Sequence, residues 1–130
     1  MTVLVDIELE LITRATARFA QAVVRDELDN NLLNELPTIQ INQIPAGDDD
    51  GIRLARMLVD IDVYHRTRAD AITLAREVHF WVTGELRGSS SSSLVIGRTG
   101  ALTLPAIRPY ENTALRRVGA TYAIFCHPVS

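Results

Sequence analysis

The clearest pattern of hydrophobic and polar positions lies between residues 56 and 64. One side of the pattern is aliphatic, with Met57, Val59, Ile61 and Val63, while Arg56, Leu58, Asp60, Asp62 and Tyr64 lie on the other. An alternation with a period of two residues over this length is typical of a β-strand with one buried face. We therefore predict a strand over 53–65 whose outer face carries two carboxylates.

The residues that follow predict a helix over 67–86. The hydroxyl of Thr67 can cap the amide of Asp70, whose negative charge suits the first turn of a helix. At about 100° per residue an apolar stripe forms. It consists of Ala71, Ala75, Val78 and Val82, flanked by Ile72, Leu74 and Trp81. The strand thus leads into a helix that packs back onto the sheet.

The chain before this unit predicts one helix and one strand. Residues 3–12 fit either element, because their apolar positions alternate while those from Leu9 to Val23 also follow helical spacing. Length favours a helix over 6–28, since strands rarely reach ten residues. A strand over 38–45 comes next, and a turn over 46–51 joins it to the strand over 53–65 as a hairpin.

The chain after the second helix predicts two further strands. Gly88 and the five serines at 89–93 are typical of a flexible connection. A strand over 94–104 follows, then an extended loop with Pro105 and Pro109, then a strand over 115–127. The expected inner face of this last strand consists of Val118, Ala120, Tyr122, Ile124 and Cys126.

This order of elements, α-β-β-α-β-β, predicts the α+β class. We expect two layers, with the helices packed on a mainly antiparallel sheet. A chain of 130 residues suits one domain spanning residues 1–130 and is long enough to bury a core.

Composition narrows the possible functions. The net charge is −3, all 13 basic residues are arginine, and the largest arginine cluster is the pair Arg116–Arg117. Proteins that hold nucleic acid by its phosphates need a basic face, so stable DNA binding is not expected. Neither a membrane span nor a secretory signal is expected from the apolar runs. Cys126, the only cysteine, is expected to be a buried, inert thiol.

The chain contains no motif typical of catalysis or metal binding. A calcium loop starting at Asp48 would need a glutamate at its twelfth position, where Val59 stands. Asp60 and Asp62 lie about 7 Å apart along the strand and have no third ligand nearby in sequence. We expect this pair to be exposed or to bind Arg56 or a neighbouring subunit. No catalytic residue, cofactor site or metal site is predicted.

Apolar residues on the outer strand faces are candidates for assembly. Leu58 and Tyr64 share the outer face with Asp60 and Asp62, and Phe125 lies outside on the last strand. These five residues form the candidate assembly surface. The alternative is that a second helix, such as the N-terminal one, covers them.

The unit over 53–86 resembles the middle of the tail terminator proteins of long-tailed phages, which are also called tail-completion or head–tail joining proteins. The shared patterns are Asp-x-x-Val-Tyr, Arg-x-x-Ala and Leu-Ala-x-x-Val. In this chain they begin at Asp60, Arg66 and Leu74. A weaker resemblance covers most of the chain, through the acidic N-terminal helix, the glycine-containing strand after residue 94 and the Thr121–Tyr122 pair.

The resemblance implies a structural virion protein at the junction of tail and neck. Such a protein forms a closed ring, a hexamer, on the head-proximal end of the tail tube, where it ends polymerisation and joins the tail to the head. Its partners would be copies of itself, the tail-tube protein and a head-side connector or stopper protein, with DNA passing through the lumen. No cofactor is implied.

Two other functions remain open from the sequence. The chain could be another neck component, such as a head-completion stopper or connector. It could also be a small α+β ligand-binding domain or enzyme. A pocket with converging polar groups would favour this alternative.

Overall fold

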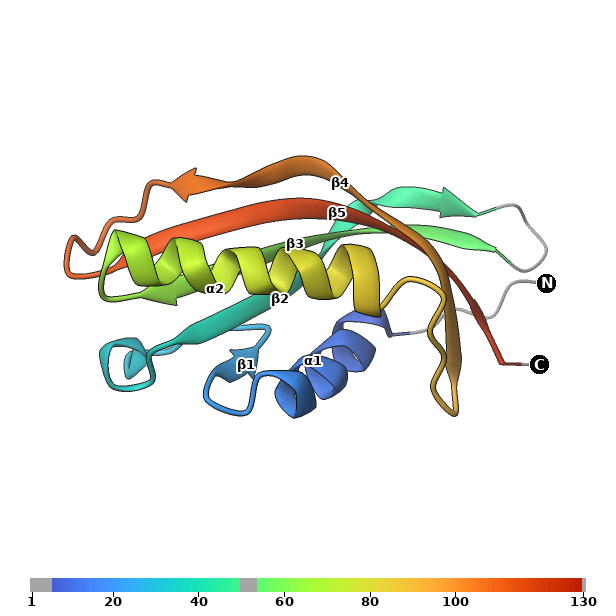
Figure 1. Ribbon diagram of the computed structural model, residues 1–130, viewed down its shortest axis with the longest axis horizontal. Helices are drawn as coiled ribbons and strands as arrows, with labels where there is room; N and C mark the ends of the chain where they lie inside the picture. Colours follow the sequence, from blue (N-terminus) through green and yellow to red (C-terminus); the bar gives the residue numbers. More distant parts are fainter. Residues whose placement is uncertain (1–5, 50–53, 130) are drawn as a thin grey trace.

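The computed structural model describes residues 6–49 and 54–129. The elements in chain order are α1 (Ile7–Arg18), β1 (Val23–Arg25), the 3-10 turn η1 (Leu32–Asn34), β2 (Thr38–Asp49), β3 (Ala55–His65), α2 (Arg68–Phe80), the π-helical turn η2 (Trp81–Glu85), β4 (Leu94–Arg108) and β5 (Arg116–Pro128). Figure 1 shows a long twisted sheet with both helices on one side. The predicted α+β class with two layers is confirmed.

The five strands form one sheet in the order β1-β2-β3-β5-β4. The pair β1–β2 is parallel, and the three other pairs are antiparallel. β3 therefore lies in the middle of the sheet, between β2 and β5, while β1 and β4 form its two edges. The pairing of β3 with β5 runs without a break, from Ala55 opposite Cys126 to His65 opposite Arg116.

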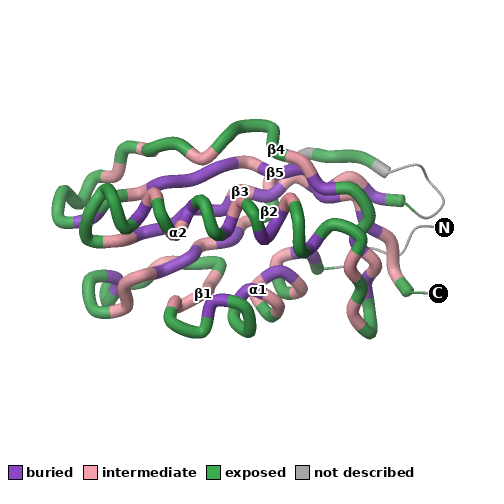
Figure 2. Tube along the Cα trace, viewed as in Figure 1, coloured by how far each residue is buried: buried purple, intermediate pink, exposed green. Residues whose placement is uncertain are grey.

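The core lies between the inner face of the sheet and the two helices (Figure 2). The predicted stripe of α2 is confirmed, since Ala71, Ala75, Val78 and Val82 are all buried in it. The predicted inner face of the last strand is buried as well, including Tyr122. The hydroxyl of Thr67 accepts a hydrogen bond from the amide of Asp70 at 3.1 Å, as the capping pattern predicts.

The first helix ends ten residues earlier than predicted. α1 stops at Arg18, and Phe19 turns inward to make an edge-to-face contact with Trp81 at 5.6 Å. Val23–Arg25 then forms strand β1 and pairs with the start of β2. The prediction relied on the helical spacing of Phe19 and Val23. The β-branched residues Val23 and Val24 instead favour a strand, because β2 provides a strand to pair with.

The hairpin of β2 and β3 is longer than predicted. β2 continues to Asp49 through an irregularity between Gln43 and Gly47. Gly47 has φ +118° and lies against the carbonyl of Arg56, so a side chain there would be strained and would collide with β3. The predicted turn over 46–51 is therefore wrong for residues 46–49, which belong to β2. The predictions for residues 3–5 and 50–53 lie outside the described residues. β4 likewise continues past its predicted end, to Arg108.

The serine segment at 89–93 packs on α1, whereas the sequence predicted a flexible connection. Arg14 donates a hydrogen bond to the hydroxyl of Ser89 at 2.7 Å. The hydroxyl of Ser93 donates one to Glu10 at 3.0 Å. Arg14 and Glu10 of α1 also form an ion pair with each other, with 2.6 Å between Nε and Oε2. The serine segment is therefore held by the ion pair of Arg14 and Glu10 on α1. The composition of the segment does not indicate this contact.

Candidate assembly surface on the outer face of the sheet

The five residues of the candidate assembly surface do not form one exposed patch. Leu58, Asp60 and Phe125 are half-buried, whereas Asp62 and Tyr64 are only 3% and 1% exposed. The prediction of an exposed surface is therefore wrong for Asp62 and Tyr64. Neither helix covers them, because both helices pack on the inner face with the main core.

Loops cover the Tyr64 end of the outer face and form a second, smaller core there. Its members are Leu32, Tyr64 and Leu115, with Leu28, Leu36 and Tyr110 packed against them. The Tyr64 hydroxyl donates a hydrogen bond to the Oε1 of Gln40 at 2.8 Å. Burial raises the pKa of Tyr64 to about 12. The segments before β2 and before β5 thus close this end of the sheet.

Asp60 and Asp62 belong to an ion-pair network that crosses three strands. The Nη1 of Arg108 lies 3.3 Å from the Oδ1 of Asp60 and 3.1 Å from the Oδ1 of Asp62. The Nη2 of Arg117 lies 3.0 Å from the Oδ2 of Asp62. The Thr121 hydroxyl donates a hydrogen bond to Asp60. The hydrogen bond to Asp62 raises the pKa of Arg117.

This network gives the two carboxylates partners other than those predicted. Arg56 lies opposite Phe125 and instead approaches Asp48, at 4.0 Å. The carboxylates of Asp60 and Asp62 are satisfied by arginines from β4 and β5. Within residues 6–49 and 54–129, no group of three side chains is arranged to hold a metal ion.

Gly119 makes room for the buried carboxylate. It lies directly opposite Asp62 in the pairing of β3 with β5. A Cβ atom at position 119 would overlap the Oδ1 of Asp62 and would lie 3.1 Å from the Cδ of Arg108. Glycine is required here because the carboxylate lies directly on the β5 backbone.

The opposite end of the outer face is open. Phe125 lies there beneath the guanidinium of Arg98, whose Cζ is 4.3 Å from the ring centre. A shallow depression of about 250 Å³ surrounds the pair and is bounded by Arg56, Leu102 and Ala123. Phe125 is therefore the member of the candidate assembly surface that lines an accessible hollow. The β4 residues that line the same hollow were not predicted from the sequence.

The largest exposed apolar side chains on the sheet lie on β4. Leu102, Leu104 and Ile107 are 50%, 71% and 45% exposed. The sequence 101–107, ALTLPAI, is mainly apolar, which is equally compatible with a buried strand, so no sequence pattern marks these side chains as exposed. Other exposed apolar residues are Leu9 on α1 and Phe80 at the end of α2.

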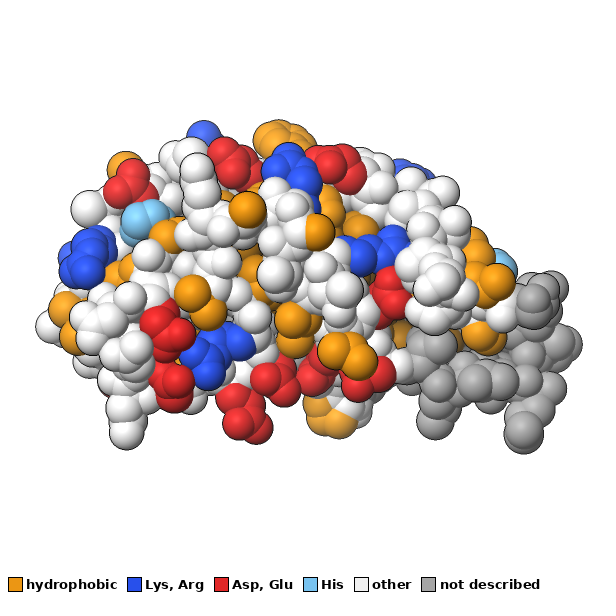
Figure 3. Space-filling model, turned by 90° about the horizontal axis from the view of Figure 1, so that it is seen from below, with side chains coloured by type: hydrophobic (Ala, Val, Ile, Leu, Met, Phe, Trp, Pro, Cys, Tyr) orange, Lys and Arg blue, Asp and Glu red, His pale blue; other side chains and the backbone are white. Residues whose placement is uncertain are grey.

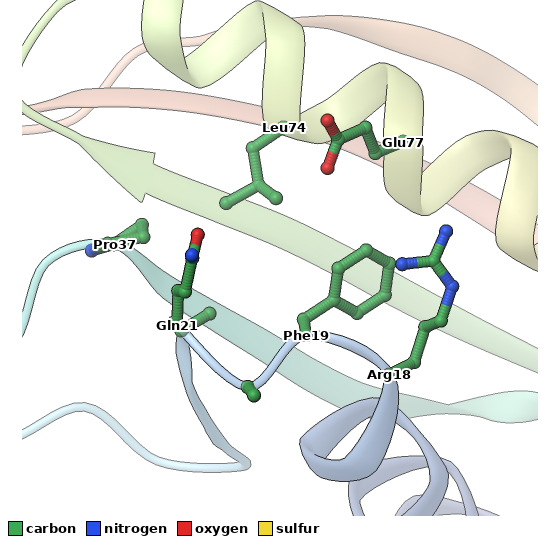
Figure 4. A pocket seen from close by; sticks show the side chains of 8 residues that line it. Arg18, Phe19, Gln21, Pro37, Leu74 and Glu77 are labelled. Carbon is green, nitrogen blue, oxygen red and sulfur yellow. The ribbon is translucent and has the colours of Figure 1, made fainter.

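A groove of about 290 Å³ lies on the helical side, between the end of α1 and α2 (Figure 4). Phe19, Pro37 and Leu74 form its apolar part, and Gln21 and Glu77 lie at its margin. Arg18, also at its rim, pairs with Glu85 at 3.0 Å, and both side chains are largely exposed. The buried titratable groups Asp62, Tyr64, Tyr122 and Cys126 do not line this groove.

The remaining polar groups of interest have structural partners. The Nδ1 of His79 lies 3.0 Å from the hydroxyl of Tyr122. Cys126 is fully buried, and burial raises the pKa of its thiol to about 11. This agrees with the predicted inert thiol.

No helix in the described part of the chain is long and apolar enough to cross a membrane. Comparison with protein-family models and with curated proteins finds no match to this chain.

Proposed function

We propose that this chain is a tail terminator of a long-tailed phage or phage-like particle. In this role it forms a closed ring, a hexamer, on the head-proximal end of the tail tube, ends polymerisation of the tube and joins the tail to the head. Its partners are its own copies, the tail-tube protein and a head-side connector or stopper. It is a structural virion protein at the junction of tail and neck and catalyses no reaction.

The proposal rests on the resemblance of the segment that forms β3 and α2, together with one structural observation. The largest exposed apolar side chains of the sheet, Leu102, Leu104 and Ile107, all belong to β4, and Ile107 borders α2. Such a cluster on the surface of a small domain is typical of a site for protein–protein contact.

The distribution of titratable groups also supports a structural role over an enzymatic one. The groove between the end of α1 and α2 has its charged groups, Arg18 and Glu77, at its margin. The buried carboxylate Asp62 is neutralised by two arginines and lies on the other face of the sheet. Active sites, by contrast, bring perturbed titratable groups together in a cleft.

A ring would end polymerisation by geometry. A cyclic assembly matches the symmetry of the tube beneath it and occupies the surface to which the next tube subunit would add. The DNA that crosses the lumen would meet a chain of net charge −3, which gives little attraction for its phosphates.

Tube growth in vitro tests this proposal. Purified tail-tube protein of the same particle is allowed to elongate with and without this protein, and tube lengths are measured by electron microscopy. We expect early addition to give short tubes with an extra ring at one end. Tubes that elongate equally in both samples would contradict the proposal, and binding to isolated heads alone would favour the stopper.

A further inference from the structure

We propose that copies of this chain associate head to tail, with a basic groove on one copy receiving an acidic edge of the next. The basic groove consists of Arg68, Ile72 and Arg76 on α2 and of Pro105 and Ile107 on β4. The acidic edge consists of Glu8 and Leu9 on α1 and of Asp26 and Glu27 after β1. This inference specifies the interface of the proposed ring and rests on that proposal.

The basic groove is an apolar trough bracketed by two positive charges. Its volume is about 350 Å³, and Ala106 and Val118 complete its lining. Arg68, Ile72 and Arg76 follow each other at intervals of four, so they share one face of α2, with the arginines about 12 Å apart along the axis. Both arginines are exposed, and neither has an ion-pair partner within the described residues.

The acidic edge lies at the other end of the strand order. The Glu8 carboxylate accepts a hydrogen bond from the amide of Gln43, while the carbonyl of Asp26 accepts hydrogen bonds from the side chains of Gln40 and Asn42. Glu8 and Asp26 therefore lie beside the same stretch of β2. Leu9, next to Glu8, is 61% exposed. Figure 3, seen from below the view of Figure 1, shows acidic side chains along its lower margin and others along its upper margin.

The two surfaces are complementary in charge. Residues 6–35 carry seven carboxylates and three arginines, a net charge of −4. Of the eight arginines in residues 66–117, Arg108 and Arg117 are paired with Asp60 and Asp62, and the groove itself contains the two exposed arginines Arg68 and Arg76. The sheet order places β1 and β4 at opposite edges, so the acidic edge and the β4 wall of the groove lie at different edges of one molecule. Each copy thus carries both halves of a contact, which is what a head-to-tail ring requires.

The contact would be made by side chains, because β4 is poorly suited to strand addition. Pro105 lacks an amide hydrogen, and the pairing of β4 with β5 shifts register at three places. Such features protect an edge strand from pairing with another strand. They leave the exposed side chain of Ile107 free to line the groove, with Leu104 beside it on the same strand.

Charge reversal with rescue by mixing tests the interface. One variant carries Arg68→Glu and Arg76→Glu, and the other carries Asp26→Arg and Glu27→Arg. All four positions are exposed, so both variants should keep the melting temperature of the wild type. Arg87→Glu is the control, because Arg87 is an exposed arginine outside the groove. Association of the full chain is measured by sedimentation at low salt.

We expect each double variant alone to associate at least about tenfold more weakly than the wild type, because like charges then face each other. An equimolar mixture should recover association, because each reversed surface then meets its complement on the other variant. The control should behave as the wild type. Unchanged association of both variants, no recovery on mixing, or a wild type that stays monomeric would overturn this interface. Tube-growth assays with the wild type test the terminator proposal independently.

Discussion

Replacing Gly119 with alanine should be among the most damaging small substitutions in this protein. The added methyl group would overlap the Asp62 carboxylate, which lies on the β5 backbone and is only 3% exposed. The side chain of Asp62 cannot move outward without leaving Arg108 and Arg117, from which it is 3.1 and 3.0 Å away. The alternative is to separate β3 from β5 in the middle of the sheet.

The expected loss in the free energy of unfolding follows from the cost of breaking a buried ion pair. Removing one partner of such a pair costs about 3–5 kcal/mol, and both arginines here are partly exposed, so they regain some hydration. We therefore expect Gly119→Ala to lower the free energy of unfolding by about 2–4 kcal/mol. Urea denaturation followed by circular dichroism measures this change.

Two further variants separate the clash from a general effect of alanine in a strand. Gly100→Ala on β4 is the matched control, since a Cβ atom there meets nothing within 4 Å. It should change the free energy of unfolding by less than about 0.5 kcal/mol. In an Asp62→Ala background the Gly119→Ala substitution should cost much less, because the carboxylate is gone. If Gly119→Ala is as stable as the control, or if its cost is the same in both backgrounds, the packing described here is incorrect.

Three further predictions concern the core, the buried protons and metal ions. Val78→Asp should destabilise the fold by more than about 3 kcal/mol, because it leaves a charge in the core; a thermal melt like that of the wild type would exclude this packing. Burial raises the pKa of Cys126 to about 11 and that of Tyr64 to about 12, so the unfolded chain releases these protons first. Stability should therefore fall as pH rises above about 9, and equal melting temperatures on either side of that pH would contradict this. Zinc, calcium and magnesium should leave the melting temperature unchanged, because Asp60 and Asp62 are occupied by arginines; a shift that disappears in Asp60→Asn would show a metal site.

Elements with a long and regular pattern could be predicted from the sequence. The alternation over 56–64 and the stripe from Ala71 to Val82 each repeat several times, so both the element and its buried face follow from them. β1 could not be predicted in this way. It has only three residues, and its stability comes from pairing with β2, which is distant in sequence.

The environment of the outer face could not be predicted, because it depends on contacts between distant segments. Arg108 and Arg117 are 46 and 55 residues from Asp62, and only the strand register brings them together. The cover over Tyr64 comes from irregular loops, which have no periodic pattern. A sequence pattern indicates which side of a strand is polar, but it does not show what packs on that side.

The most direct test of the proposed function is the morphology of particles made without this protein. Without a terminator nothing caps the tube, and an open-ended polymer continues to add subunits. We therefore predict that electron micrographs of particles made without this gene will show intact heads beside tails of uncontrolled length. Tails of normal length would contradict the account: with unjoined or leaking heads they would indicate a head-completion protein, and with unchanged particles an enzyme.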